Sequence, residues 1–321
     1  MGQHGRAVVA GPFVWLCPGQ GAQQVGMGKD LAERFPAARA TFEAIDAALA
    51  APLSGLMFEG PEVELTATHN AQPAILAHSA AVFAVVRDKS GMAQAAAGHS
   101  LGEYSAYVAA GALDPAAAAK LVRRRGELMH KAGIERPGTM AAVLGLGTAD
   151  VEAACHEASG RGTVAVAANI NAPDQTVISG DPDAVMRAGE GCKKRGAKRV
   201  IGLKVSGAFH SPLMAPAASK LQLALEQAPW RDPQFPVIAN ATAEPVKDAA
   251  RARRLLTDQL TAPVRWVDSM KRAAELAGEG VRFLEIGPGA VLAGLLRRIV
   301  PGANVTSLSS ADDITRFLEA A

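Results

Sequence analysis

The stretch AQAAAGHSLGEYSA, residues 93–106, places Ser100 between Gly98 and Gly102. The small apolar residues before Gly98 predict a short strand, and the residues after Ser100 predict a helix. The pattern Gly-x-Ser-x-Gly between a strand and a helix is typical of a nucleophile elbow, a strained turn that exposes the serine hydroxyl at a helix N-terminus. The alternative is a serine that only caps a helix in a glycine-rich turn.

Strands and helices alternate along the chain on both sides of this elbow. FVWLC (13–17) predicts a buried strand, PGQGAQQVGMG (18–28) a loop, and residues 29–50 a helix. Further helices are predicted over residues 72–89 and 115–131. After residue 206 the expected elements are a helix from Pro212, the strand PVIAN, a helix over 266–276, the strand RFLEIG, a helix from Val291, the strand NVTSL and a last helix. This order predicts a doubly wound, mostly parallel α/β sheet with helices on both faces.

The segment between these two halves has a different pattern. Its expected elements, in the order β-α-β-β-α-β, are TMAAVLGL, TADVEAACHEAS, TVAVAAN, QTVISG, PDAVMRAGEGCKKRG and KRVIGLKV. That order is typical of a ferredoxin-like unit. We therefore expect a small domain at residues 137–205, inserted into a larger α/β domain made of residues 1–136 and 206–321.

The composition is that of an ordinary globular protein. Of the 321 residues, 49% are hydrophobic and 20% are charged, and the formal net charge of +2 does not indicate a nucleic-acid partner. The N-terminal residues lack the features of a signal peptide, and no apolar run is long enough to span a membrane. Cys17, Cys155 and Cys192 lack the paired spacing of a zinc site or a disulfide framework, so we expect reduced thiols in a cytoplasmic protein without a bound metal. No coiled coil or long edge strand is evident, so a monomer is expected.

A serine nucleophile needs a base, and His210 is the candidate among the seven histidines. It lies in a loop after a predicted strand, and open α/β sheets place their sites at the carboxyl ends of strands. A loop histidine without a role is the alternative. His99 is expected to orient the turn rather than take the proton, because neighbouring side chains diverge there. The Leu101 amide is one expected donor to an oxyanion, and the loop around Gln20 is the candidate for the second.

These motifs together resemble those of the malonyl-CoA:acyl carrier protein transacylase family over nearly the full length of the chain. They are PGQGAQ (18–23), HNAQPAILA (69–77), GHSLGEYSA (98–106), RRRGELM (123–129), ANINAPDQTVISG (168–180), GAFHSPLM (207–214), QLTAPVRW (259–266) and EIGPGAVLAGL (285–295). Eight motifs in the family's order make the resemblance specific. It implies a hydrolase-like α/β fold with a ferredoxin-like insertion, which the order of elements also predicts.

The resemblance further implies a role for each residue of the site. It assigns Ser100 as nucleophile, His210 as its base, Gln20 and Leu101 as the oxyanion hole, Arg125 as the partner of the substrate's free carboxylate, Gln259 as the residue whose backbone carbonyl orients His210, and His99, Asn171 and Phe209 as residues around the pocket. A planar guanidinium binds a carboxylate in a bidentate manner, which would select malonyl over a neutral acyl chain. Phe209 matches the malonyl-type pattern, whereas methylmalonyl-type domains carry a serine there.

The implied function is acyl transfer in fatty-acid or polyketide synthesis. A malonyl group passes from malonyl-CoA through an acyl-serine to the phosphopantetheine thiol of an acyl carrier protein, and no metal or redox cofactor is required. One alternative is an acyl hydrolase, in which water replaces the acceptor thiol, although a site for neutral chains gains nothing from a buried Arg125. The other is a docking module without catalysis. The basic clusters Lys193–Arg199 and Arg297–Arg298 are candidate docking sites for an acidic carrier protein.

Overall fold

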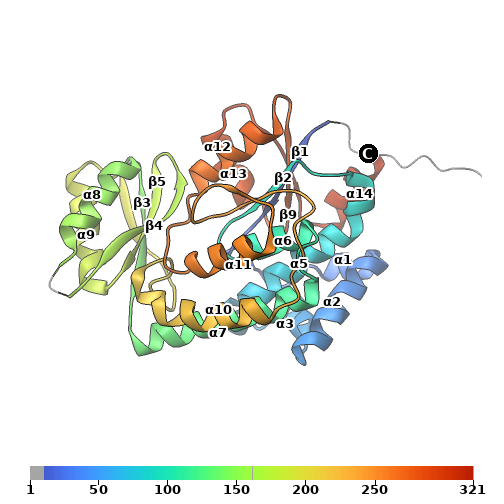
Figure 1. The fold of residues 1–321 in the computed structure, drawn as a ribbon, viewed down its shortest axis with the longest axis horizontal. Coiled ribbons are helices and arrows are strands. Elements are labelled where there is room, and N and C mark those ends of the chain that lie inside the picture. The colour runs from blue at the N-terminus through green and yellow to red at the C-terminus, as the bar shows by residue number, and fades with distance from the viewer. Residues whose placement is uncertain (1–10, 161, 321) are drawn as a thin grey trace, which may run out of the picture.

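The structure is a computed structural model that describes residues 11–160 and 162–320. The expectation about a signal peptide concerns residues 1–19, of which residues 1–10 lie outside the described residues. The chain forms a larger sheet surrounded by helices and a smaller sheet beside it (Figure 1). This confirms the predicted architecture of a mostly parallel α/β sheet with a small antiparallel unit.

The larger sheet contains six strands in the order β10-β9-β1-β2-β7-β8. All neighbouring strands are parallel except β7 and β8. The strands are β1 (Phe13–Cys17), β2 (Ala95–Gly98), β7 (Val237–Ile238), β8 (Pro245–Val246), β9 (Arg282–Ile286) and β10 (Asn304–Leu308). Because the parallel strands run in one direction, the residues that follow β1, β2 and β7 meet at the same edge of the sheet.

The side chains of β1 alternate between two hydrophobic cores. Trp15 and Cys17 belong to the core that includes residues of α5 (Thr68–Ser90), α6 (Gly102–Ala109) and α7 (Pro115–Glu135), whereas Val14 and Leu16 belong to the core that includes residues of α12 (Trp266–Ala277) and α13 (Val291–Ile299). Helices therefore cover both faces of the sheet. A strand that is buried on both faces is apolar throughout, which explains the composition of FVWLC.

The elbow between β2 and α6 is packed backbone to backbone against the end of β1. A Cβ atom at Gly98 would lie 1.9 Å from the carbonyl oxygen of Gly102, and one at Gly102 would lie 2.1 Å from the carbonyl oxygen of Cys17. No side chain fits at either glycine. Ser100 between them has a φ of +53°, in the left-handed region that is strained for a residue with a side chain.

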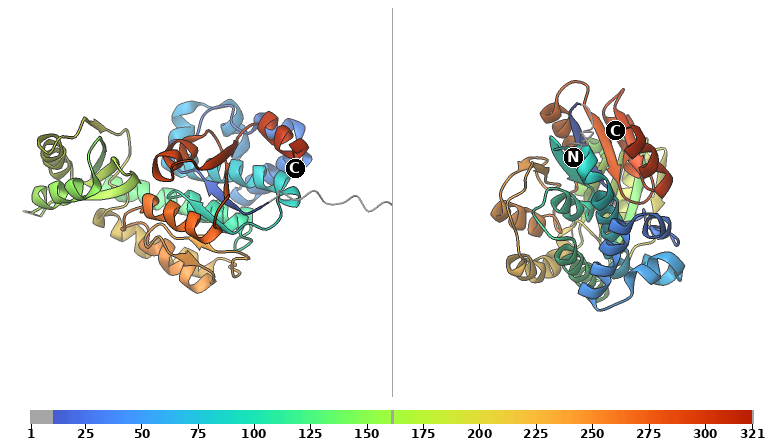
Figure 2. Two further views of the ribbon diagram at one scale, coloured as in Figure 1. Left: turned by 90° about the horizontal axis from the view of Figure 1, so that it is seen from above. Right: turned by 90° about the vertical axis from the view of Figure 1, so that its right-hand side faces the viewer.

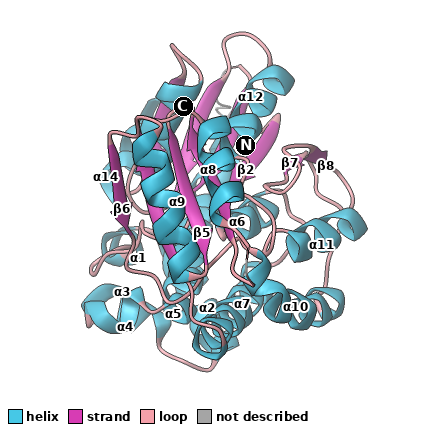
Figure 3. Ribbon diagram, turned by 90° about the vertical axis from the view of Figure 1, so that its left-hand side faces the viewer, coloured by secondary structure: helices cyan, strands magenta, loops and turns pink. Residues whose placement is uncertain are grey.

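The smaller sheet is antiparallel, with the strand order β4-β5-β3-β6. Its elements are β3 (Thr139–Leu144), α8 (Thr148–Ala158), β4 (Ala165–Ala172), β5 (Gln175–Gly180), α9 (Pro182–Lys194) and β6 (Arg199–Gly202). Both helices pack on one face of this sheet and form a separate core with it (Figure 3). The order and the connections are those of the predicted ferredoxin-like unit.

The smaller sheet lies at one end of the molecule (Figure 2). Backbone hydrogen bonds link it to the segment before α12: the Ile170 N–H donates to the Val264 carbonyl at 2.9 Å, and the Val264 N–H donates to the Ala168 carbonyl at 2.8 Å. β4 is thus held in register against the segment that leads into α12.

The prediction of one helix over residues 29–50 is wrong, because the segment forms α1 (Lys29–Arg34) and α2 (Pro36–Leu49). Pro36 has no N–H to continue the first helix, and Phe35 before it is extended, with φ −122° and ψ 112°. The unpredicted elements are α3 (Leu53–Glu59), α4 (Glu62–Thr66), β8 and α11 (Ala249–Asp258), and the remaining helices are η1 (Pro212–Met214), α10 (Ala215–Gln227) and α14 (Ala311–Ala320). Within the described ranges, no helix is both long enough and apolar enough to cross a membrane.

The close approach of α5 and α7 leads to a prediction about Gly126, which lies inside α7. A Cβ atom there would lie 2.6 Å from the Cα atom of His69, so Gly126→Ala should force the two helices apart. We expect a loss of about 1–3 kcal/mol in the free energy of unfolding, measured by urea denaturation. Gly294→Ala in α13 is the matched control, since nothing lies within 4 Å of its added Cβ and alanine is the better helix former. A Gly126→Ala protein as stable as this control would contradict the prediction.

Candidate active site

Ser100 lies at the carboxyl end of β2, with its hydroxyl next to the ring of His210. The two residues are 110 positions apart in sequence, and Ser100 Oγ lies 2.7 Å from His210 Nε2. The Ser100 N–H donates to the side-chain oxygen of Asn240 at 2.7 Å. Asn240 follows β7, the next strand of the same sheet, and its amide also donates to the Gly98 carbonyl at 2.7 Å. The strained turn is thereby held by a neighbouring strand end.

His210 lies between β6 and η1, and its ring is oriented by a backbone carbonyl. Its Nδ1 atom lies 2.8 Å from the carbonyl oxygen of Gln259, at the end of α11. A carbonyl only accepts, so Nδ1 carries the proton and Nε2 presents its lone pair to the Ser100 hydroxyl. Burial, together with the positive charge of Arg125, lowers the pKa of His210 from 6.5 to about 3. The imidazole is therefore neutral at pH 7 and can accept the serine proton.

Arg125 lies on α7 with 1% of its surface exposed, and its guanidinium reaches the same serine. Nη1 donates to Gln72 Oε1 at 2.7 Å, and Nη2 donates to Gln259 Oε1 and to Ser100 Oγ, both at 3.0 Å. Among the described residues, no carboxylate forms an ion pair with this guanidinium, and its Nε atom has no hydrogen-bond partner. A buried cation with these contacts can receive an anionic group beside the serine.

Backbone amides next to the serine provide a place for an oxyanion. Leu101 is the N-cap residue of α6, so its N–H lies at the positive end of the helix dipole. The loop of Gln20 is packed against the elbow, because a Cβ atom at Gly19 would lie 2.5 Å from the His99 carbonyl oxygen. The Gln20 side chain points elsewhere and donates to Thr68 Oγ1 at 3.2 Å, so only its backbone remains as a candidate donor.

Of the three further residues expected around the pocket, His99 and Asn171 contact each other, whereas Phe209 lies in the hydrophobic core. His99 Nε2 lies 2.8 Å from the side-chain oxygen of Asn171, at the end of β4, and the ring of His99 packs on Trp266 with 5.4 Å between centroids. This pair joins the smaller sheet to the elbow. Phe209 is buried in the main hydrophobic core directly before His210.

Sequence reasoning missed three residues that hold this arrangement: Gln72, Glu103 and Asn240. Asn240 had a usable signal, since it is a polar residue at the carboxyl end of a strand predicted for the same sheet. Gln72 and Glu103 lie within predicted helices, and nothing in their local sequence distinguishes them from ordinary helical residues. Both are fully buried, which only the packing of α5 and α6 determines.

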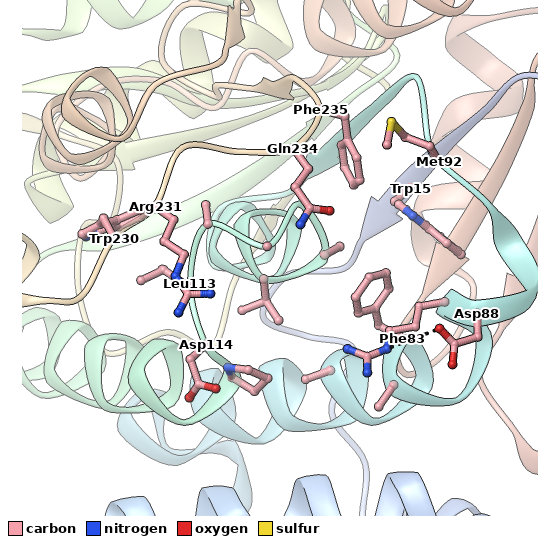
Figure 4. Close-up of a pocket in the computed structure, with 18 of the residues that line it drawn as sticks. Trp15, Phe83, Asp88, Met92, Leu113, Asp114, Trp230, Arg231, Gln234 and Phe235 are labelled. Carbon is pink, nitrogen blue, oxygen red and sulfur yellow. Dashed lines mark ion pairs between the residues drawn. The ribbon is translucent and has the colours of Figure 1, made fainter.

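None of these residues lines the cavity of about 810 Å³ that Figure 4 shows in close-up. It is lined by residues that include Trp15, Phe83, Met92, Trp230 and Phe235. Met92 and Phe235 precede β2 and β7, so the cavity lies toward the amino ends of the parallel strands, opposite Ser100. No group of three or more histidine, cysteine or acidic side chains is placed to hold a metal ion in the part of the chain that the structure describes.

An elbow serine bonded to a neutral buried histidine, beside the amides of a helix N-terminus, is the arrangement of an enzyme that works through a covalent acyl-serine.

Residues 14–315 match the family described as the acyl transferase domain. The chain is 44% identical over 303 residues to the malonyl CoA-acyl carrier protein transacylase of Bacillus subtilis, covering 94% of this chain and 95% of that protein. For the Escherichia coli transacylase the identity is 42% over 309 residues, with coverages of 96% and 99%.

Solved structures that are similar to this chain come from the same kind of enzyme as these relatives. An acyl carrier protein S-malonyltransferase from Vibrio cholerae has a TM-score of 0.90 and 39% identity, covering 95% of this chain and 99% of that chain. A structure described as a type II PKS acyl-carrier protein in complex with its malonyl-transacylase has a TM-score of 0.91 and 41% identity, with coverages of 97% and 100%. The chain belongs to the malonyl CoA-acyl carrier protein transacylase family.

The lowered pKa of His210 predicts how the stability depends on pH. Between pH 3 and pH 6.5 the unfolded chain binds a proton on this histidine that the folded protein does not bind. The contribution of His210 to the free energy of unfolding is therefore complete above pH 6.5 and is lost as the pH falls from 6.5 towards 3. In His210→Asn this contribution is absent. The wild type should therefore lose about 2 kcal/mol more than His210→Asn between pH 7 and pH 5, measured by urea denaturation. Equal losses in the two proteins would contradict the shift.

Proposed function

We propose that this protein transfers a malonyl group from malonyl-CoA to the phosphopantetheine thiol of an acyl carrier protein. The observation that carries the proposal is Arg125, a fully buried guanidinium without a carboxylate partner among the described residues, whose Nη2 lies 3.0 Å from the Ser100 oxygen. A buried cation is costly unless it is paired. The free carboxylate of a malonyl group supplies that pair, whereas an acetyl group does not.

In the first half-reaction, Ser100 Oγ attacks the thioester carbonyl while His210 Nε2 takes the hydroxyl proton. The negative charge on the carbonyl oxygen is stabilised by the N–H groups of Leu101 and Gln20. The carbon–sulfur bond then breaks, and the CoA thiolate leaves with the proton from His210. Between these two proton transfers His210 is an imidazolium, and the Gln259 carbonyl oxygen stabilises it by accepting a hydrogen bond from Nδ1. The serine–histidine dyad therefore works without an acidic third residue.

In the second half-reaction, the phosphopantetheine thiol takes the place of CoA. His210 accepts the thiol proton, the sulfur attacks the malonyl-serine carbonyl, and the bond to Ser100 Oγ breaks as the serine regains a proton. Arg125 holds the malonyl carboxylate through both steps, which keeps the acyl group aligned. The site thus returns to its starting state, and the reaction follows ping-pong kinetics.

The names of the relatives support malonyl-CoA as donor and a carrier protein as acceptor. Three cations of the two basic clusters are less available for carrier docking than the sequence indicates. Arg298 bonds to Asp174, Arg195 to Glu157 and Lys193 to Glu190, so these cations already have anionic partners. The three cysteines are buried free thiols, which supports a cytoplasmic location.

We also assign the segment 137–205 to a separate inserted domain and residues 1–136 with 206–321 to the catalytic domain. The separate core of the smaller sheet supports this division. Asn171 is the contribution of the inserted domain to the site, through its contact with His99.

The proposed nucleophile predicts the outcome of a labelling experiment. Wild-type protein mixed briefly with equimolar malonyl-, methylmalonyl- and acetyl-CoA should gain the mass of one malonyl group, and added carrier protein should remove it. Ser100→Ala should gain no mass, because the hydroxyl that lies 2.7 Å from the base His210 is then absent. Intact-protein mass spectrometry measures both. Malonyl label on Ser100→Ala would refute the assignment, and a wild-type adduct that decays to free malonate in the presence of carrier protein would favour the hydrolase.

The proposed carboxylate site predicts a change in substrate preference. Arg125→Ala should lower kcat/KM for malonyl-CoA about 10- to 100-fold, the value of a charge-assisted hydrogen bond, and leave that for acetyl-CoA nearly unchanged. Arg124→Ala is the matched control on the same helix, since Arg124 is exposed and pairs with Glu127. Initial rates of transfer to the carrier protein provide the measurement. An unchanged malonyl-to-acetyl ratio in Arg125→Ala would remove this role.

A further inference from the structure

Glu103 is a fully buried carboxylate in the first turn of α6, three residues after Ser100. Its Oε2 atom accepts two hydrogen bonds, from the Asn240 N–H at 2.9 Å and from Gln259 Nε2 at 2.7 Å. Its Oε1 atom has no partner among the described residues. The mechanism above does not use this carboxylate, although one of its partners, Gln259, contacts Ser100, His210 and Arg125.

The side chain of Gln259 lies between the buried anion and the buried cation. Its Nε2 donates to Glu103 and, at 3.0 Å, to the Ser100 carbonyl, while its Oε1 accepts from Arg125. Its backbone carbonyl orients His210. The residue thus connects the serine and the guanidinium through its side chain and the base through its backbone carbonyl.

The Asn240 N–H donates to Glu103 Oε2, so this oxygen is an acceptor whether the carboxyl group is ionised or carries a proton on Oε1. That acceptor determines which way the Gln259 amide points. With Nε2 toward Glu103, the amide oxygen faces Arg125. The reversed amide would direct its oxygen at the Glu103 carboxylate and at the Ser100 carbonyl, and its NH₂ group at the guanidinium. Each of these contacts would be repulsive, so the reversed state is excluded as long as an acceptor occupies position 103.

We propose that Glu103 is a positioning residue that fixes the Gln259 amide and thereby holds Arg125 where it receives the malonyl carboxylate. The inference rests on the proposed function and assigns to Glu103 a part of its substrate selectivity. The amide between them keeps Glu103 and Arg125 from pairing directly. The guanidinium is therefore held by neutral oxygens, and it keeps its charge for the substrate.

Burying the charged form of Glu103 is unfavourable, which distinguishes this residue from one that only fills space. Burial raises the pKa of Glu103 to about 7, against the lowering effects of its hydrogen bonds from Asn240 and Gln259 and of the Arg125 charge. Burial lowers the pKa of Arg125, and the Glu103 charge acts in the opposite sense. An apolar side chain at position 103 would avoid the first cost but would leave the Gln259 amide free to turn.

Two variants separate amide orientation from packing. Glu103→Gln keeps an oxygen for Asn240 and Gln259 and places its NH₂ group where Oε1 has no partner, so we expect a malonyl-to-acetyl ratio of kcat/KM within about threefold of the wild type. Glu103→Met keeps the volume but removes the acceptor. There we expect the ratio to fall about tenfold or more, through a higher KM for malonyl-CoA with kcat nearly unchanged.

Glu285→Met is the matched control, because Glu285 in β9 is a second fully buried carboxylate. Among the described residues it accepts from the N–H groups of Leu292 and Ala293 at the start of α13 and from the Ser307 hydroxyl, and none of these three residues belongs to the site. This variant should lose stability but keep the substrate ratio. If Glu103→Met does not fold, Gln259→Met removes the other end of the same contact and should show the same fall in ratio.

Initial rates with malonyl-CoA and acetyl-CoA and a carrier protein distinguish the outcomes. An unchanged ratio in Glu103→Met, or in Gln259→Met where that variant replaces it, would overturn the inference. A Glu103→Gln protein as impaired as Glu103→Met would also overturn it, because charge rather than amide orientation would then be decisive. A wild type that transfers no malonyl group would overturn the proposed function and this inference together.

Discussion

The contact between the elbow and the end of β1 is the constraint from which the site is built. Gly102 lies so close to the Cys17 carbonyl that a Cβ atom would come within 2.1 Å of it. This contact brings the loop after β1 to the start of α6, so two segments with backbone amides meet beside Ser100. The serine itself is left in a left-handed conformation, with its hydroxyl 2.7 Å from His210 Nε2. Asn240, at the end of the neighbouring strand β7, then holds the strained turn from the other side.

Buried charge is the second organising feature of the site. Arg125 and Glu103 are both fully buried, and the Gln259 amide lies between the guanidinium and the carboxyl group. A direct ion pair would satisfy the guanidinium and leave little for a substrate. Separation by an amide keeps the two charges close enough to compensate each other's burial in part. The resulting site has an unsatisfied cation next to a nucleophile, which suits a substrate that carries both a thioester and a carboxylate.

The local motifs could be read from the sequence because they reflect constraints among residues that are adjacent in the chain. The elbow at Ser100 depends on two glycines within five residues, and the βαββαβ pattern depends on the order of elements. The prediction of one helix over residues 29–50 was wrong for a local reason as well, because Pro36 and the extended Phe35 interrupt an otherwise helical pattern. The roles given to Arg125 and Gln259 came from the resemblance to a family and not from any local pattern around them.

The sequence by itself determined the fold class, the position of the strained serine turn and the family to which the chain is similar. Only the tertiary structure decided that Ser100 and His210, 110 residues apart, lie 2.7 Å from each other, and that Gln259 reaches the carbonyl of Ser100 across 159 residues. It alone revealed Gln72, Glu103 and Asn240 as supports of the site. The physical reason is that strain, glycine and helix-start preferences are properties of short segments. Hydrogen bonds between buried polar groups instead depend on how separate strands and helices pack, and a helical glutamate or glutamine has the same local sequence signal whether it faces solvent or a nucleophile.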